Sequence, residues 1–320
     1  MIRISNGEKL PFTQSQIQTK GWAIEARVCA EDPGTFLPAI GKLVKYLEPK
    51  SHNGSIRCDT GLVQGSSVTI HYDPLLCKVV AYAPTRDQAI QEMKYALDRY
   101  LITGVQTNVS LLCDIFNNPR FQSGKLSTAF LAQEYPSGFA YRPDERSRAQ
   151  LAILSAFIYF CNENRNAPKR ALKICRPVYI KINNSAPLHV NVSWDDDKLS
   201  LTHKELEYHV ETKWQPGQVY IEAALNSKAG ASNVAMICAA TKPLGFSLVN
   251  HGVPFDVTVL TEAQFKLLPY IKEKKVVDQE FLVVSPMPGL ILSVAVEKGQ
   301  IVEHGQELAV IEAMKMQVIH

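Results

Sequence analysis

The residue with the most evident chemical potential is Lys315, which lies between Met314 and Met316 in the string Glu-Ala-Met-Lys-Met. Strand-like residues 308–311 precede it, and glycine turns separate it from strand-like residues 290–296. Short strands joined by such turns predict a hairpin with Lys315 at its tip. An amine at that tip is accessible to a modifying enzyme, and a group attached to it can swing. For the bare tripeptide, a solvated loop lysine explains the pattern equally well.

The bulk composition is that of two or three globular domains. The chain has 320 residues, 46% of them hydrophobic and 20% charged, which is enough for sizeable cores. A net charge of +3 gives no indication of a nucleic-acid or membrane partner. The seven cysteines are scattered without a Cys-x-x-Cys pair, so we predict no disulfide framework and no metal site. No targeting segment is recognised, and the longest apolar run, residues 151–161, is about half of the ~20 residues that a membrane span needs.

The first region of the chain mixes strands and helices. The expected strands are residues 23–28, 67–72 and 78–82. The spacing of Thr85 and Gln88 is that of a capping box, and apolar residues at helical spacing predict a helix to about Tyr100. A second amphipathic helix is expected over residues 109–116 and is stopped by Asn-Pro at 118–119. Strands followed by helices predict an α+β fold.

The middle region begins after a boundary rich in Pro, Gly and Ser at residues 135–144. An apolar helix is expected over residues 145–163, and beyond it apolar residues alternate with polar ones. The expected strands are residues 178–182, 190–194, 206–214, 219–223 and 253–259. This spacing predicts a helix followed by a β-barrel or a sandwich. Three aspartates in the turn at residues 195–198 do not match an EF-hand loop, so we interpret them as a solvated hairpin turn.

Several motifs resemble one protein family. Residues 21–33, which start with Gly-Trp-Ala-Ile-Glu-Ala-Arg and end with Ala-Glu-Asp-Pro, resemble the C-terminal lobe of biotin carboxylases. So do residues 56–61 (Ile-Arg-Cys-Asp-Thr-Gly), 71–78 (His-Tyr-Asp-Pro-Leu-Leu-Cys-Lys) and 105–108 (Val-Gln-Thr-Asn). Ser-Pro-Met-Pro-Gly at 285–289, with the lysine string described above, resembles a biotinyl domain. In this order the motifs resemble alpha subunits of biotin-dependent acyl-CoA carboxylases, most closely the propionyl-CoA type.

The resemblance implies a multidomain chain. It places an α+β biotin carboxylase C-terminal lobe at residues 1–140, a helix plus antiparallel β-barrel (the subunit-contact or BT domain) at 145–272, and an all-β biotinyl (hammerhead) domain at 280–320. It also calls for an ATP-grasp region ahead of Met1 and for a second half of the biotinyl domain after Lys315. The sequence holds no glycine-rich phosphate loop and no Asn-x-Arg-x-Gln-Val-Glu-His segment. We therefore expect an internal segment of such a subunit, which by itself does not carboxylate biotin and is poorly biotinylated.

The resemblance also assigns site residues. Arg57 matches the family arginine beside the ureido group of biotin, where a fixed guanidinium stabilises the negative charge that deprotonation places on the ureido oxygen. A surface ion pair with Asp59 is the alternative. Asp73 either orients Arg57 or lines the pocket, or it only forms the Asp-Pro turn. We interpret His71 as a strand residue rather than a base. Structural ion pairing is expected of the other charged residues in these motifs, which are Glu25, Arg27, Glu31 and Asp32.

The function implied by the resemblance is ATP-dependent carboxylation of biotin held covalently on Lys315. Met314 and Met316 complete the attachment signature, and biotin protein ligase installs the cofactor. ATP with Mg or Mn belongs to the parent protein, in which the barrel docks a carboxyltransferase beta subunit that acts on propionyl-CoA. We expect a hetero-oligomer in the mitochondrial matrix, or in the cytoplasm of a bacterium. The alternatives are a methylcrotonyl-CoA or other acyl-CoA carboxylase alpha subunit, and a non-catalytic fragment that only binds partners. A lipoyl carrier is disfavoured, because lipoyl lysines do not lie between methionines.

Overall fold

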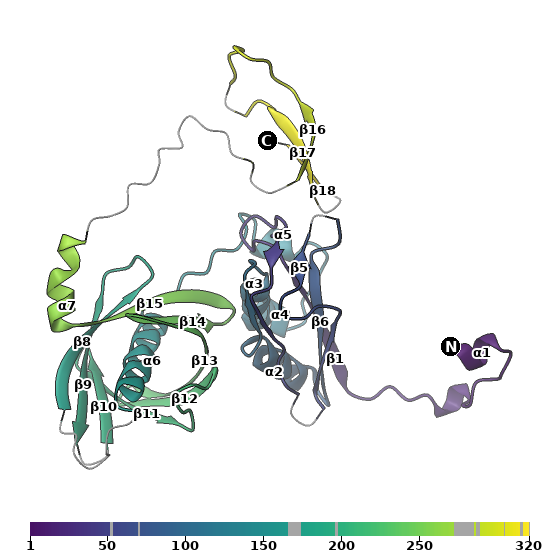
Figure 1. Ribbon diagram of the computed structural model, residues 1–320. Helices are drawn as coiled ribbons and strands as arrows, with labels where there is room; N and C mark the ends of the chain where they lie inside the picture. The colour runs from purple at the N-terminus through teal and green to yellow at the C-terminus, as the bar shows by residue number, and fades with distance from the viewer. Residues whose placement is uncertain are drawn as a thin grey trace.

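The computed structural model describes residues 1–51, 54–69, 71–165, 174–195, 198–271, 285, 289–303, 305–313 and 316–319. Figure 1 shows an α+β lobe, a barrel around a helix, and a small sheet at the C-terminal end. An exposed N-terminal segment with two short helices, α1 (Ile2–Ser5) and η1 (Gln14–Gln16), precedes the lobe. Among the described residues, no helix is long and apolar enough to span a membrane.

An antiparallel sheet with two helices on one face forms the core of the lobe. Its elements are the strands β1 (Trp22–Cys29), β6 (Leu75–Ala83) and β4 (Ile56–Thr60), in that spatial order, and the helices α2 (Arg86–Leu97) and α3 (Val109–Asn117). Alternate strand residues such as Val28 and Val79 are buried together with Met93 of α2. This period of two buries one face of the sheet and leaves the other to solvent.

Shorter elements complete the lobe. The strand pairs are β2 (Gly41–Lys42) with β5 (Ser67–Val68) and β3 (Lys45–Leu47) with β7 (Leu101–Thr103), and the helices α4 (Pro119–Gln122) and α5 (Phe130–Glu134) follow α3. Thr85 caps α2 as predicted, since its hydroxyl accepts a hydrogen bond from the Gln88 amide at 3.3 Å. The helix ends at Leu97, slightly before the predicted end at about Tyr100. Tyr100 lies beyond the helix and is buried, and its hydroxyl lies 2.6 Å from that of Tyr46, because the chain already turns toward β7.

The predicted strand over residues 67–72 is also too long. Strand β5 ends at Val68, and His71 lies in a turn. The Asp73 carboxylate accepts a hydrogen bond from the Leu75 amide at 3.0 Å. This local bond stabilises a turn ahead of β6 and keeps His71 out of any strand.

The barrel is closed, and it contains helix α6 (Glu145–Glu163), which covers the predicted residues. Asp144 caps the helix by accepting a hydrogen bond from the Ser147 amide at 2.7 Å. Around the barrel the eight antiparallel strands are β10 (Lys198–His203), β11 (Leu206–Thr212), β12 (Tyr220–Ser227), β13 (Gly230–Lys242), β14 (Gly245–Asn250), β15 (Val253–Thr261), β8 (Ile174–Ile182) and β9 (Leu188–Asp195). Of the two architectures that the sequence left open, the barrel is therefore the one formed.

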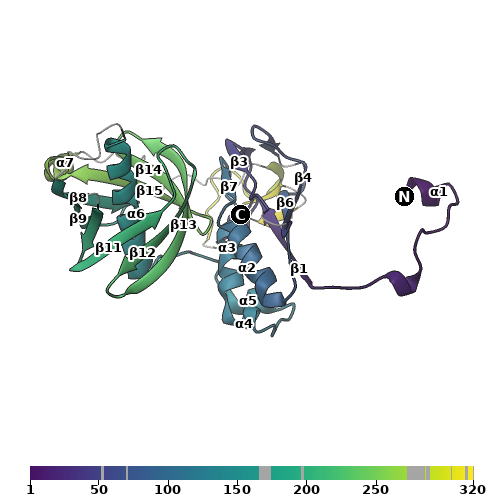
Figure 2. The same cartoon turned by 90° about the horizontal axis from the view of Figure 1, so that it is seen from below.

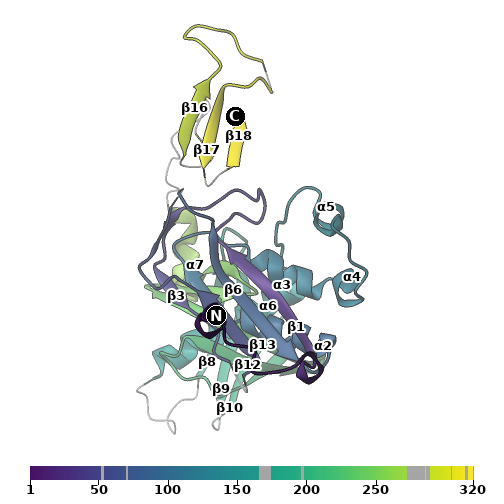
Figure 3. The same cartoon turned by 90° about the vertical axis from the view of Figure 1, so that its right-hand side faces the viewer.

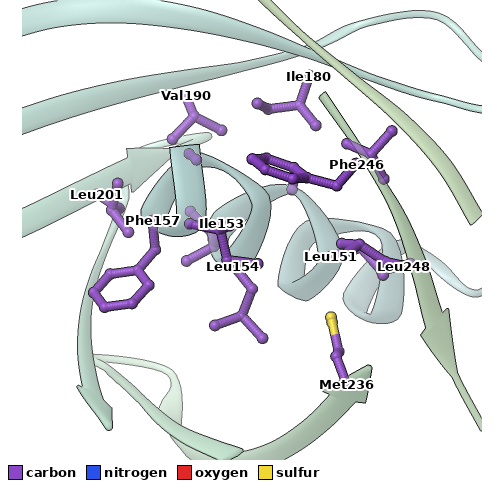
Figure 4. Close-up of a cluster of buried hydrophobic side chains, with 14 of the residues drawn as sticks. Leu151, Ile153, Leu154, Phe157, Ile180, Val190, Leu201, Met236, Phe246 and Leu248 are labelled. Carbon is purple, nitrogen blue, oxygen red and sulfur yellow. The ribbon is translucent and has the colours of Figure 1, made fainter. Parts of the chain in front are cut away.

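The barrel core consists of the helix and the inward side chains of the strands. Leu151, Ile153 and Leu154, labelled in Figure 4, are fully buried. Helical spacing places Leu151 and Leu154 on one side of the helix and Ile153 on another. A helix that is apolar on all sides is typical of complete burial. Phe157 packs against Trp214 at a ring-centroid distance of 6.3 Å. Helix α7 (Glu262–Leu267) and the short η3 (Leu268–Tyr270) follow the last strand.

The C-terminal sheet has the order β16 (Leu290–Val294), β17 (Ala309–Ala313) and β18 (Met316–Ile319), and Figure 3 shows it as a separate body. The predicted turn at Gly299 is present, and its φ of +91° explains the glycine. The centre of the aspartate turn, residues 196–197, lies outside the described residues.

The lobe and the barrel contact each other directly. Figures 1 and 2 both place β13 on the side of the barrel that faces the lobe. Leu101 of the lobe is buried with Ile237, Ala239 and Val249 of the barrel. Beside this apolar contact, Arg99 Nε donates a hydrogen bond to Glu222 Oε1 at 3.0 Å.

Candidate active-site face and carrier hairpin

The solvent face of the β1-β6-β4 sheet carries a set of charged side chains, and Figure 3 views the lobe from this side. The strand register places these residues in two rows across the sheet. In one row Glu25 and Arg57 lie on either side of the uncharged Val80, and the next row is Arg27, Lys78 and Asp59. Residues directly opposite each other in an antiparallel pair share a face, with Cβ atoms about 4.5–5.5 Å apart. Segments distant in sequence thus contribute to one charged face.

Arg57 forms a two-pronged ion pair with Asp59 on its own strand. Arg57 Nε lies 2.9 Å from Asp59 Oδ1, and Nη2 lies 3.0 Å from Oδ2. The Arg57 side chain is 69% exposed, so the pair itself contributes at most about 1 kcal/mol to stability. Its geometric effect is larger, because a guanidinium held at two points has a fixed orientation. The ion pair that the sequence offered as the alternative is therefore present, and it gives the exposed guanidinium a fixed orientation.

Asp73 lies at the end of the same face. In addition to its bond to the Leu75 amide, one carboxylate oxygen of Asp73 lies 4.0 Å from Arg27 Nη2. Its charged partner is thus Arg27, which the sheet register places in the row next to that of Arg57. Asp73 therefore both stabilises its turn and contributes a carboxylate to the charged face.

Asn108 fixes strand β1 from behind. This side chain is 6% exposed; its oxygen accepts a hydrogen bond from the Cys29 amide at 2.9 Å, and its amide donates to Arg27 O at 3.1 Å and to Glu31 Oε1 at 3.0 Å. Burial raises the pKa of Glu31, and the bond from Asn108 opposes that shift. Sequence reasoning noted residues 105–108 only as a family motif. The available signal was an amide residue at the start of a helix, which sequence alone assigns to capping.

A buried hydroxyl network supports β4. Tyr46 OH donates to Thr60 Oγ1 at 3.0 Å, and Thr60 Oγ1 donates to Leu76 O at 2.8 Å. Burial raises the pKa of Tyr46 to about 12, so this residue stays a neutral donor at physiological pH. The network joins β3, β4 and the start of β6, and it fixes the end of the strand that presents Arg57.

The C-terminal strands form the framework of the predicted hairpin. β17 pairs with β18 in antiparallel register, with Ala313 opposite Met316 and Glu312 opposite Gln317. Met316 begins β18. Met314 and Lys315, which connect the strands, lie outside the described residues.

Three family descriptions match successive parts of the chain. Residues 25–133 match "Biotin carboxylase C-terminal domain", residues 159–274 match "Propionyl-coenzyme A carboxylase BT domain", and residues 282–319 match "Biotin-requiring enzyme". With the relatives below, they show that the chain carries these three domains in succession and that it is similar over its whole length to acyl-CoA carboxylase alpha chains. The resemblance predicted from the motifs is thus confirmed, as is the order of lobe, barrel and biotinyl domain.

Among individual proteins, the chain is similar to propionyl-CoA carboxylase alpha chains. The mitochondrial protein of Caenorhabditis briggsae is 37% identical over 342 residues, with 99% of this chain and 45% of that protein covered. The human protein is 32% identical, covering 99% of this chain and 44% of its own length. The alpha subunit of mouse methylcrotonoyl-CoA carboxylase is 28% identical, with 99% and 45% covered. This chain therefore spans a little under half the length of these relatives.

Proposed function

We propose that this chain serves in a propionyl-CoA carboxylase, where Lys315 carries biotin and Arg57 assists its ATP-dependent carboxylation. The observation that carries the proposal is the oriented, exposed Arg57 on the charged face of a lobe that shares its chain with a biotinyl domain. Carboxybiotin then moves to a carboxyltransferase beta subunit docked on the barrel. ATP with Mg or Mn, this partner and the mitochondrial matrix belong to the same proposal.

The choice of propionyl-CoA rests on two comparisons. The barrel matches the BT domain of propionyl-CoA carboxylase, and identity is 32–37% to the propionyl-CoA carboxylase alpha chains of human and nematode against 28% to the mouse methylcrotonoyl-CoA carboxylase subunit. Co-purification of the beta subunit, followed by assays with both acyl-CoA substrates, tests this choice. Carboxylation of methylcrotonyl-CoA in preference to propionyl-CoA contradicts it.

The role of Arg57 is electrostatic. Removal of the ureido proton of biotin develops negative charge on the ureido oxygen, and an oriented guanidinium lowers the energy of that charge. The Asp59 pair holds the guanidinium in place before biotin arrives, so little reorganisation is needed. Asp73, through Arg27, contributes to the field of the same face.

A pair of substitutions separates this role from a surface ion pair. In the assembled carboxylase that contains this chain, Arg57→Gln is expected to lower the rate of biotin carboxylation by about 10²–10³-fold, the usual cost of one oxyanion donor. Asp59→Asn keeps the guanidinium and is expected to cost less than about tenfold. If both variants lose the same activity, Arg57 acts only as the partner of Asp59.

Biotin attachment is tested on the chain itself. Because the chain by itself is expected to be a poor substrate, treatment with biotin protein ligase, ATP and biotin is expected to give a weak streptavidin-reactive product, and Lys315→Arg is expected to abolish it. The matched control is Lys298→Arg, which changes an exposed lysine in the turn after β16 and is expected to leave labelling unchanged. Label that persists in Lys315→Arg assigns the cofactor to another lysine.

A further inference from the structure

The turn between β14 and β15 brings the barrel into contact with the start of helix α3. His251 and Gly252 form this turn, with φ angles of +49° and +71°. A Cβ atom added to Gly252 would lie 2.6 Å from Val109 Cγ1 and 2.8 Å from the Ser110 amide nitrogen. The close approach therefore requires a glycine, and any side chain there must push the lobe away.

His251 contacts the end of helix α2 from the same turn. Its Nδ1 lies 2.8 Å from Oδ1 of Asp98, the C-cap residue directly after the helix. The side chain of Asp98 is only 19% exposed, and that of His251 is 44% exposed. A left-handed conformation costs a non-glycine residue about 1–3 kcal/mol and persists where its surroundings compensate. The bond to Asp98 is such a compensation.

The rest of the turn is fixed to the barrel. The Asn250 side chain, 5% exposed, donates a hydrogen bond to Ala235 O on β13 at 2.8 Å. His251 and Gly252 thus extend from a rigid base, and they contact the lobe at the junction of α2 and α3. Asn108, which fixes strand β1, directly precedes the contacted Val109.

We propose that residues 250–252 form a proton-dependent latch, which holds the barrel tightly on the lobe while His251 is protonated and weakens when His251 loses its proton. The latch connects two domains through charge rather than through apolar contact alone. Because the contacted helix start adjoins Asn108, the state of the latch also reaches strand β1 and its charged face. The inference is independent of biotin, ATP and acyl-CoA.

The charges around His251 give the sign of the effect. The hydrogen bond to Asp98 raises the pKa of His251 above its usual 6.5, with Lys94 of α2 and burial opposing the shift. Arg99 and Glu222 line the same cleft between lobe and barrel and bond to each other. A histidine with a raised folded-state pKa contributes stability that is complete below pH 6.5 and is lost as the pH rises through the folded value. The latch is therefore strongest in mild acid and weakest in alkaline solution.

Amide hydrogen exchange of the intact chain measures the latch directly. Protection factors, corrected for the intrinsic pH dependence of exchange, are followed in peptides spanning residues 98–112 and 245–255. In the wild type they are expected to fall by about tenfold between pH 6 and pH 9, the size expected for loss of one charge-assisted bond. In His251→Gln and Asp98→Asn they are expected to be low and independent of pH. His209→Gln, which removes a histidine 4.0 Å from Glu207 of the same strand, is the matched control and retains the wild-type profile.

A glycine pair tests the geometry separately from the charge. Gly252→Ala is expected to lower the protection of residues 98–112 by tenfold or more at all pH values. Gly217→Ala also places alanine at a positive φ, +100°, but no atom lies within 4 Å of its added Cβ, so lobe protection stays unchanged. Wild-type protection that does not vary with pH, or pH dependence that survives in both His251→Gln and Asp98→Asn, overturns the proposal even if Gly252→Ala fails to fold.

Discussion

Replacement of Asn108 by alanine is expected to destabilise the lobe far more than its position at a helix end suggests. The substitution removes three hydrogen bonds, to Cys29 N, Arg27 O and Glu31 Oε1, from a side chain that is 6% exposed. Each net bond contributes about 1 kcal/mol, and an unpaired buried group costs more, so we expect a loss of about 3 kcal/mol in the free energy of unfolding of the lobe.

Asn118→Ala is the matched control for this prediction. Asn118 also makes three hydrogen bonds, to Arg120 N, Phe121 N and Glu134 Oε2, but it does so at the cap of the short helix α4 and nearer to solvent. Loss of an N-cap costs about 1 kcal/mol. Amide exchange of β1 peptides across a urea series gives the unfolding free energy of the lobe in each variant. If Asn108→Ala costs no more than Asn118→Ala, Asn108 does not fix strand β1.

Two further stability predictions follow from buried groups. Burial raises the pKa of Glu31 in the folded lobe above its usual 4.5. The wild-type lobe therefore loses stability as the pH rises from 4.5 through this raised folded-state pKa. The urea midpoint of Glu31→Gln should therefore equal that of the wild type at pH 4 and exceed it at pH 7. Equal midpoints at pH 7 contradict the argument that burial of the charged carboxylate costs stability. Leu154→Ala leaves a cavity inside the barrel and should cost about 2–5 kcal/mol, measured by urea unfolding. Leu131→Ala, at a side chain 46% exposed, should cost within about 0.5 kcal/mol, and similar losses in the two variants would place Leu154 outside a tight core.

The sequence predicts best those elements whose signals are local. Helix α6 has a capping aspartate at Asp144 and a long apolar run, and both of its ends agree with the prediction. Strand β14 was missed, because five of its six residues are buried and alternation is lost. Closure of the barrel was left open as well, since it depends on pairing between β8 and β15, which are distant in sequence.

Within the candidate site, too, residues with a local sequence signal were found and residues with long-range partners were missed. Arg57, Asp59 and the residues around Lys315 belong to contiguous motifs, so the sequence alone points to these positions, and the role of Arg57 toward biotin stays a prediction. Asn108 was missed as a support of β1, because its partners Arg27 and Cys29 lie about 80 positions earlier in the chain. The contact of Gly252 with Val109 was invisible for the same reason. Long-range partners decide what these residues do, and spacing in the sequence carries no record of them.

The helix within the barrel also has a consequence for how this protein folds during its synthesis. α6 leaves the ribosome first, whereas the barrel closes only when β15 pairs with β8 and Val257 comes to lie opposite Ile182. About a hundred residues separate the end of the helix from the end of β15, and synthesis at roughly 5–20 residues per second takes about 5–20 seconds for that length. During this interval the apolar helix lacks a closed barrel around it. Its apolar surface is therefore open to chaperones and to aggregation until β15 is made.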